Sequence, residues 1–219
     1  MTKNQFKALL NLEDNIIPPG KKNRPGTPIS ASFLTIHNTD NASVGADARM
    51  HGKFLVNSGF YMLKGKQHFV SWHYTVDDKR VVKHLPINEK AFHAVEGNSV
   101  SIGIEICMNK GIDQKRAFLN GARLTALLLF EIKALNKDVK KVVPHKHWTG
   151  KDCPSLLLDA GNILGQKWKG FLDMVQNELN SITDIESEIL ETMEVDNGEL
   201  SEKELKAMQK AAKSHFDEN

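Results

Sequence analysis

Long hydrophobic runs are missing from this sequence, and so are a recognisable export signal and internal repeats. No stretch approaches the roughly 18 uninterrupted apolar residues of a membrane-spanning helix, so we expect no membrane insertion. The opening MTKNQFKALLNLEDN has neither the apolar core nor the small-residue cleavage site of a signal peptide, which predicts synthesis in the cytoplasm. No repeat marks the C-terminal part as a repetitive binding module.

Cysteine is scarce, because the chain has only Cys107 and Cys153. Two cysteines could form one disulfide, but a chain without an export signal matures where thiols stay reduced. A chemical or metal-binding role is therefore the better expectation for at least one thiol. We expect Cys107 to be a small buried apolar residue.

The formal net charge of the whole chain is only +2, but the charged residues are distributed unevenly along it. Residues 184–204 carry nine acidic residues against one lysine, which leaves +10 for the rest. A basic body suggests an anionic partner, such as nucleic acid or an acidic wall polymer. We divide the chain into a domain at 1–180 and an acidic helical extension at 181–219, which could dock on the body or mediate self-association.

The periodicity of apolar residues predicts strands interleaved with helices. An α/β domain with one sheet and helices laid on it follows from that order. After an extended Pro- and Gly-rich loop at 16–28, we expect a strand at 32–40, a helix at 44–57, a hairpin at 68–86, a strand at 99–108, and helices at 116–135 and around 156–179.

Alternation within these strands predicts which side chains share a face. In SFLTIHNTD, His37 lies on the face opposite Ile36, near the end of the strand. In SVSIGIEICM, Glu105 points away from the isoleucines and lacks an obvious charge partner. In the hairpin, Trp72 and Tyr74 are expected on one side and His73 on the other.

PHKHWTGKDCP, residues 144–154, combines the residue types that bind zinc. Catalytic zinc sites use three protein ligands, commonly imidazole and thiolate, and leave the fourth position to water. His145 and Cys153 could supply two ligands and His37 the third, because Gly150 allows the intervening chain to turn back. A surface histidine, or a Cys153 nucleophile with His145 as its base, is compatible with the same spacing.

Four motifs in order resemble a known family: FLTIHNT, SWHYTVDD, SIGIEICM and PHKHWTGKDCP. Together they are similar to the zinc N-acetylmuramoyl-L-alanine amidases of phage endolysins and bacterial autolysins, which are related to the peptidoglycan-recognition proteins. The likeness spans residues 16 to about 178. It implies a single mixed β-sheet flanked by helices, with one Zn²⁺ bound per chain.

The resemblance also implies roles for individual residues. His37, His145 and Cys153 match the zinc ligands, and Lys151 and Glu105 match the catalytic lysine and general base. Two further residues, Trp72 and His93, resemble substrate-binding positions of the family. Where some branches have a catalytic tyrosine this chain has Trp72, so either Glu105 handles the protons alone or Tyr74 assists.

The expected function is hydrolysis of the amide between N-acetylmuramic acid and L-alanine in peptidoglycan. The alternative is a protein of the same fold that binds peptidoglycan without cleaving it. We expect no nucleic-acid partner, and action on the wall after release through a membrane lesion or a dedicated secretion machine. The remaining histidines, including His51, His68, His84 and His215, are expected at the surface, and His147 in a loop beside the site.

Overall fold

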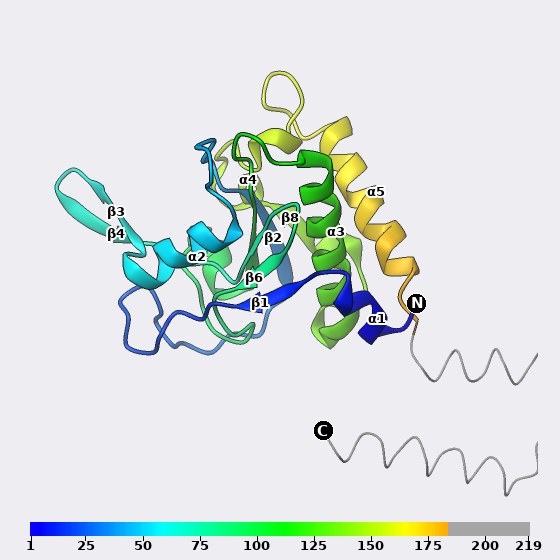
Figure 1. Cartoon of the computed structure of the whole chain (residues 1–219), viewed down its shortest axis with the longest axis horizontal. Helices are drawn as coiled ribbons and strands as arrows, with labels where there is room; N and C mark the ends of the chain where they lie inside the picture. The colour runs from blue at the N-terminus through cyan, green and yellow to red at the C-terminus, as the bar shows by residue number, and fades with distance from the viewer. Residues whose placement is uncertain (184–219) are drawn as a thin grey trace, which may run out of the picture. The chain divides into compact units, whose positions relative to one another are not determined.

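A computed structural model describes residues 1–183, and the statements below concern that part of the chain (Figure 1). Met1–Ile182 form one compact unit. The acidic segment at 184–204 and His215 lie outside the described residues, and the separate C-terminal extension stays a prediction. No helix within 1–183 is long and apolar enough to cross a membrane.

A six-stranded mixed sheet forms the centre of the domain, as predicted. Its strand order is β1-β6-β5-β7-β2-β8, and every neighbouring pair is parallel except β5 with β6. The bounds are β1 Leu12–Asp14, β2 Phe33–Asn38, β5 Tyr74–Val76, β6 Val81–Lys83, β7 Ser101–Ile106 and β8 Val142–Pro144. The hairpin β3 Phe60–Leu63 with β4 Lys66–Phe69 forms a second, separate sheet.

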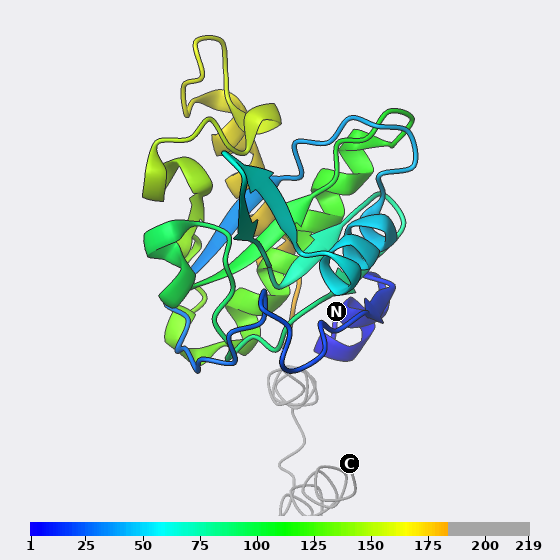
Figure 2. The same ribbon diagram turned by 90° about the vertical axis from the view of Figure 1, so that its left-hand side faces the viewer.

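Helices cover both faces of the sheet (Figures 1 and 2). The longest are α3, Gln114–Glu131, and α5, Gln166–Asn180, which pack together on one face. On the other face α2, Ala48–Asn57, packs against β5 and β6, and short α4, His145–Thr149, against β2 and β8. The remaining segments are α1 Lys3–Ala8 and the 3-10 turns Val95–Ser99, Lys133–Leu135, Val139–Lys141 and Ser155–Leu157.

Alternation along the two central strands separates the core from the site. Leu34 and Ile36 of β2 lie in register with Ile102 and Ile104 of β7, and all four are fully buried in the main core under α3 and α5. Because successive strand residues point to opposite faces, His37 and its register partner Glu105 face the other side. The predicted faces of both strands are therefore confirmed.

Several predicted boundaries and faces were wrong. The predicted helix 44–57 begins only at Ala48, where the Asp47 side chain accepts a hydrogen bond from Met50 N, and the helix near 156–179 begins at Gln166. His68 belongs to β4 rather than to the hairpin with β6, and Trp72 precedes β5. Tyr74 lies in register with Ile104 in the main core, opposite the face of Glu105, so it does not share a side with Trp72.

Candidate metal centre and active site

Three side chains from distant parts of the sequence converge at the ends of β2 and β8. The ligand atoms of His37, His145 and Cys153 all lie within 4.8 Å of one another. His37 is the fifth residue of β2, His145 begins α4 directly after β8, and Cys153 follows the turn at Gly150. The close approach predicted for these three residues is present in the structure.

The short helix α4 is what brings His145 to the sheet. Its Trp148 indole Nε1 donates a hydrogen bond of 2.9 Å to Thr35 Oγ1 on β2. Gly97 allows this approach, because a Cβ there would lie 2.8 Å from the Trp148 ring. The predicted loop histidine, His147, instead lies on this helix and is exposed.

Cys153 is placed by a turn that closes back on α4. Gly150 ends the helix with φ of +75°, a conformation that favours glycine. Lys146 N then donates to Cys153 O at 2.9 Å, which ties the two ends of the turn together. Asp152 accepts hydrogen bonds from Lys146 Nζ and Asn162 Nδ2, so it is a turn residue and not a partner of the cluster.

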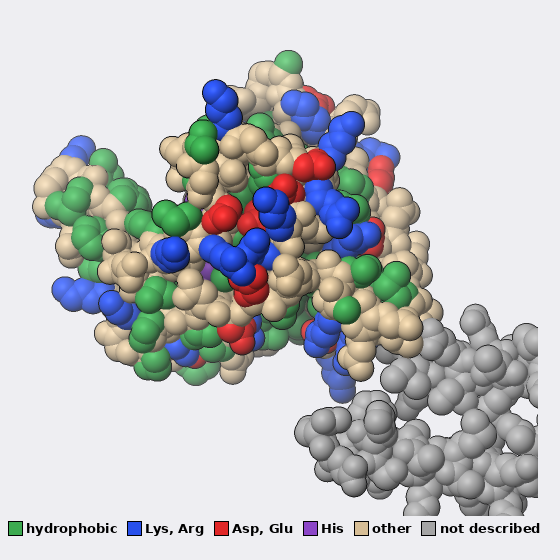
Figure 3. Space-filling view, viewed as in Figure 1, with side chains coloured by type: hydrophobic (Ala, Val, Ile, Leu, Met, Phe, Trp, Pro, Cys, Tyr) green, Lys and Arg blue, Asp and Glu red, His purple; other side chains and the backbone are tan. Residues whose placement is uncertain are grey.

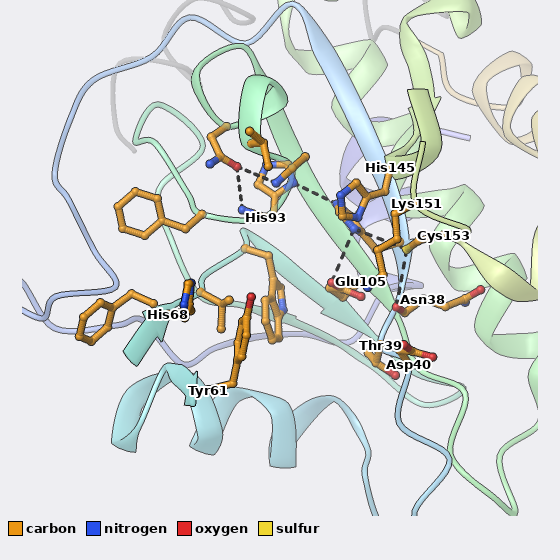
Figure 4. Close-up of a pocket in the computed structure, with 18 of the residues that line it drawn as sticks. Asn38, Thr39, Asp40, Tyr61, His68, His93, Glu105, His145, Lys151 and Cys153 are labelled. Carbon is orange, nitrogen blue, oxygen red and sulfur yellow. Dashed lines mark hydrogen bonds and ion pairs between the residues drawn. The ribbon is translucent and has the colours of Figure 1, made fainter. Parts of the chain in front are cut away.

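The two nitrogens of the His37 ring face different neighbours. Nε2 shares a hydrogen bond of 3.0 Å with His93 Nδ1, while Nδ1 lies 3.7 Å from Cys153 Sγ (Figure 4). The Nδ1 atom is therefore the one directed into the cluster. Sequence reasoning placed His93 among substrate-binding residues and missed this contact with His37, because it joins residues 56 positions apart.

Burial keeps the imidazoles of the cluster neutral. Desolvation, reinforced by His93 and His145, holds the pKa of His37 well below its usual range. Desolvation and Lys151 likewise lower the pKa of His145 to about 4. Because His37 is neutral, its 3.8 Å approach to Glu105 Oε1 is not an ion pair. Neutral imidazoles are the form that binds a metal ion.

The Cys153 thiol is buried, with 5% of its surface exposed. Desolvation, with a further contribution from Glu105, raises its pKa to about 12. Without a metal ion beside it, this thiol stays protonated at neutral pH even with Lys151 nearby, which argues against a free cysteine nucleophile. A divalent metal ion would reverse that balance, because a coordinating thiol loses its proton. Two neutral imidazoles and one such thiol fit the donor set of a zinc site.

Glu105 completes the cluster from β7. Desolvation raises its pKa to about 8, and the nearby Lys151 opposes that rise. Its Oε2 atom is buried and has no hydrogen-bond partner within the described residues. An unpaired carboxyl oxygen beside a metal-binding cluster is an acceptor in place for a proton of a bound water molecule.

The cluster opens into a hollow of about 650 Å³. Lys151, Trp72 and His93 all line it, as their predicted roles require. Trp72 is largely buried, and its indole Nε1 donates to Thr75 Oγ1 at 2.7 Å, so it presents a ring face with its polar atom already satisfied. Thr39, two residues beyond His37, also lines the hollow with a buried unpartnered Oγ1, and sequence reasoning did not single it out.

Two histidines expected at the surface are buried. His84 is fully buried between Asn15 O and Thr75 Oγ1, and His51 is 8% exposed against Asp47 O. The prediction was wrong because their partners come from other segments, which local polarity does not reveal. The predictions of a buried Cys107 and an exposed His68 are confirmed.

Comparison with known proteins places this geometry in a family. The family model described as N-acetylmuramoyl-L-alanine amidase matches residues 25–156. The chain is 42% identical to the N-acetylmuramoyl-L-alanine amidase XlyA of Bacillus subtilis (strain 168) over 69% of this chain and 49% of the relative. It is 38% identical to CwlH of the same strain over 77% of this chain and 62% of the relative.

The solved catalytic domain of XlyA is similar throughout its length. The TM-score is 0.65 at 39% identity, and the match covers 76% of this chain and 99% of that domain. The chain spans only about half to three fifths of the length of the two curated relatives. Residues 25–156, which the family model matches, include all three residues of the candidate metal-binding cluster. By both the family model and the solved catalytic domain, the chain belongs to the N-acetylmuramoyl-L-alanine amidase family.

Proposed function

We propose that this chain is a zinc-dependent peptidoglycan hydrolase that cleaves the amide between N-acetylmuramic acid and L-alanine of the stem peptide. One observation carries the proposal: three metal-ligand atoms lie within 4.8 Å of one another beside Glu105, whose buried Oε2 has no partner. Family membership supplies the reaction and the substrate class.

His37, His145 and Cys153 would hold the zinc ion. When bound, zinc acts as a Lewis acid that polarises an amide carbonyl and lowers the pKa of water toward about 7. The protein contributes a fixed arrangement of donors, because His93 and Trp148 restrain the elements on which the ligands lie.

Glu105 is the proposed general base and then general acid. Its carboxylate takes a proton from the attacking water, a bond forms from the water oxygen to the carbonyl carbon, and the proton passes to the nitrogen as the C–N bond breaks. A pKa raised to about 8 suits the second half of this exchange, in which Glu105 donates, and the charge of a zinc ion held by the neighbouring ligands would lower that pKa and favour the carboxylate that the first half needs. Lys151 would offset the negative charge that develops on the carbonyl oxygen.

The wider role extends from this chemistry. We propose that bacterial peptidoglycan is the partner and that the chain acts on the wall after leaving the cell that makes it, as an endolysin or autolysin-like enzyme. We also propose that residues 181–219 form a separate extension to a catalytic domain at 1–180. Deletion of 181–219, followed by comparison of activity on whole cells and on isolated walls, tests whether that extension targets the enzyme.

The deciding experiment is a pair of measurements on Glu105→Gln. We expect release of new peptide amines from purified walls to fall by about 10²- to 10⁴-fold, because the proton acceptor is lost, while zinc content stays near one equivalent. Wild-type protein treated with a chelator serves as the metal-free control. Undiminished amine release by Glu105→Gln would remove Glu105 from the mechanism, and absence of amine release by the wild type would favour a binding protein.

A further inference from the structure

The β3–β4 hairpin has no role in the chemistry above, although it borders the same hollow. It forms its own two-stranded sheet and projects from the body beyond α2 (Figure 1). Hydrophobic side chains gather on it in the space-filling view (Figure 3). Tyr61, Met62 and Leu63 are 51%, 58% and 49% exposed. Of these three, Tyr61 is the residue that lines the hollow, so it is the one placed to contact a ligand there.

Contacts at the base of the hairpin join its two strands and, through Lys22, connect it to the body. The rings of Phe60 and Phe69 meet there with centroids 5.9 Å apart, and Lys22 Nζ lies 5.7 Å from the centre of the Phe69 ring. Val70 N donates to Gly59 O at 2.9 Å and closes the base. A two-stranded hairpin is marginally stable by itself, and these contacts stabilise it at its base.

Tyr61 and His68 are a cross-strand pair on the side of the hairpin that faces the hollow. Their rings stack with centroids 5.4 Å apart and an interplanar angle of 17°. Both residues line the hollow that contains the metal-binding cluster, and they point into it opposite His145 and Cys153 (Figure 4). Within the described residues, neither the Tyr61 hydroxyl nor a His68 nitrogen has a hydrogen-bond partner.

We propose that Tyr61 and His68 form a stacking platform for a sugar ring of the glycan strand. The inference rests on the proposed function, which brings a glycan and a peptide to opposite sides of the scissile amide. A pyranose ring has an apolar C–H face and a rim of hydroxyl groups. The outer face of a stacked ring is a flat apolar surface with polar atoms at its edge, and Gln67 and Asn98 line the same hollow.

A second hollow, of about 570 Å³, suits the peptide better than the sugar. It meets the first at Tyr61, Trp72 and Lys151, but its walls include the apolar side chains of Val44, Met50 and Phe54. Sugar hydroxyl groups buried against those apolar side chains would lose hydrogen bonds to water, and the first hollow has more polar side chains to replace them. The sugar is therefore the better match to the hairpin side.

Binding of a peptide-free oligosaccharide of alternating N-acetylglucosamine and N-acetylmuramic acid tests the proposal by calorimetric titration. Tyr61→Ala should weaken binding about tenfold, the effect of losing one aromatic stacking contact, and His68→Ala should also weaken it. Met62→Ala is the matched control, because Met62 is equally exposed on the adjacent position but lines neither hollow. Thermal unfolding of all variants should match the wild type.

The remaining outcomes separate the two proposals. Wild-type protein that releases amines but binds no oligosaccharide overturns the platform and leaves the hydrolase intact. Oligosaccharide binding that depends on Tyr61, without amine release, supports the platform and overturns the hydrolase. If Tyr61→Ala instead weakens binding of a sugar-free stem peptide and leaves oligosaccharide binding unchanged, the assignment of this surface to sugar is wrong. It is also wrong if Met62→Ala weakens oligosaccharide binding as much as Tyr61→Ala does.

Discussion

Gly103 on β7 is the position where a single methyl group should disturb the metal centre from a distance. A Cβ added there would lie 2.8 Å from both Cγ and Nδ1 of the His93 ring. Ordinary contact at that position begins near 3.4 Å, so the ring must move by about 0.6 Å. The affected atoms lie at the root of the ring, which cannot swing aside as the end of a flexible chain does.

Displacement of the His93 ring should affect His37 through one hydrogen bond. His93 Nδ1 is 3.0 Å from His37 Nε2, and a displacement of about 0.6 Å along that line takes the pair beyond hydrogen-bond distance. Loss of a group that orients a metal-ligating histidine typically weakens metal binding about 10- to 100-fold. Gly103→Ala should therefore lower zinc affinity by that factor and destabilise the metal-free fold by about 1–3 kcal/mol through overpacking.

A double-mutant cycle with His93→Ala isolates this clash. Once the ring is removed, Gly103→Ala should be neutral or stabilise the protein by up to about 1 kcal/mol, because glycine weakens a strand interior. The assays are urea unfolding of metal-free protein at pH 7 and zinc competition against a chelator. If Gly103→Ala lowers the free energy of unfolding by the same amount with and without the His93 ring, the reasoning is refuted.

Three further predictions follow from burial. Burial lowers the pKa of fully buried His73 to about 4, so its neutral form stabilises the fold above pH 6.5 and that stability is lost as the pH falls toward 4. The free energy of unfolding in urea should fall by about 2 kcal/mol between pH 7 and pH 5 because of this residue. An unchanged pH dependence of that free energy in His73→Gln would contradict this origin. Phe171→Ala, at a fully buried ring between α5 and α3, should cost about 3–5 kcal/mol by the same assay, whereas a cost below about 1 kcal/mol would mean that the core collapses around it. Zinc should bind Cys153→Ser more weakly than the wild type in competition against a chelator, because the buried thiol is the only sulfur donor of the cluster, and equal affinity would exclude Cys153 as a ligand.

Prediction from sequence succeeded where the signal was local. Alternation placed Ile102, Ile104 and Leu34 on the core face and left Glu105 on the other, because a strand sends successive side chains to opposite sides whatever it packs against. Imidazole and thiolate are intrinsic metal donors, which made His37, His145 and Cys153 candidate ligands, and the resemblance to the amidase family selected these two histidines among nine.

Prediction failed where a residue's environment depends on segments that are far away in the sequence. His51 and His84 read as polar surface residues, yet tertiary packing buries both beside Asp47, Asn15 and Thr75. The Tyr61–His68 stack was missed because β3 and β4 carry apolar residues on an exposed hairpin, which hydrophobic periodicity does not anticipate.

The sequence by itself determined the α/β architecture, the faces of the two central strands and the chemical types of the candidate metal donors, because periodicity and side-chain chemistry are local properties of the chain. Only the tertiary structure decided that His37, His145 and Cys153 meet, that His93 holds the far side of the His37 ring, and that burial makes these imidazoles neutral. Those properties depend on distances and desolvation, which arise only when remote segments pack against one another.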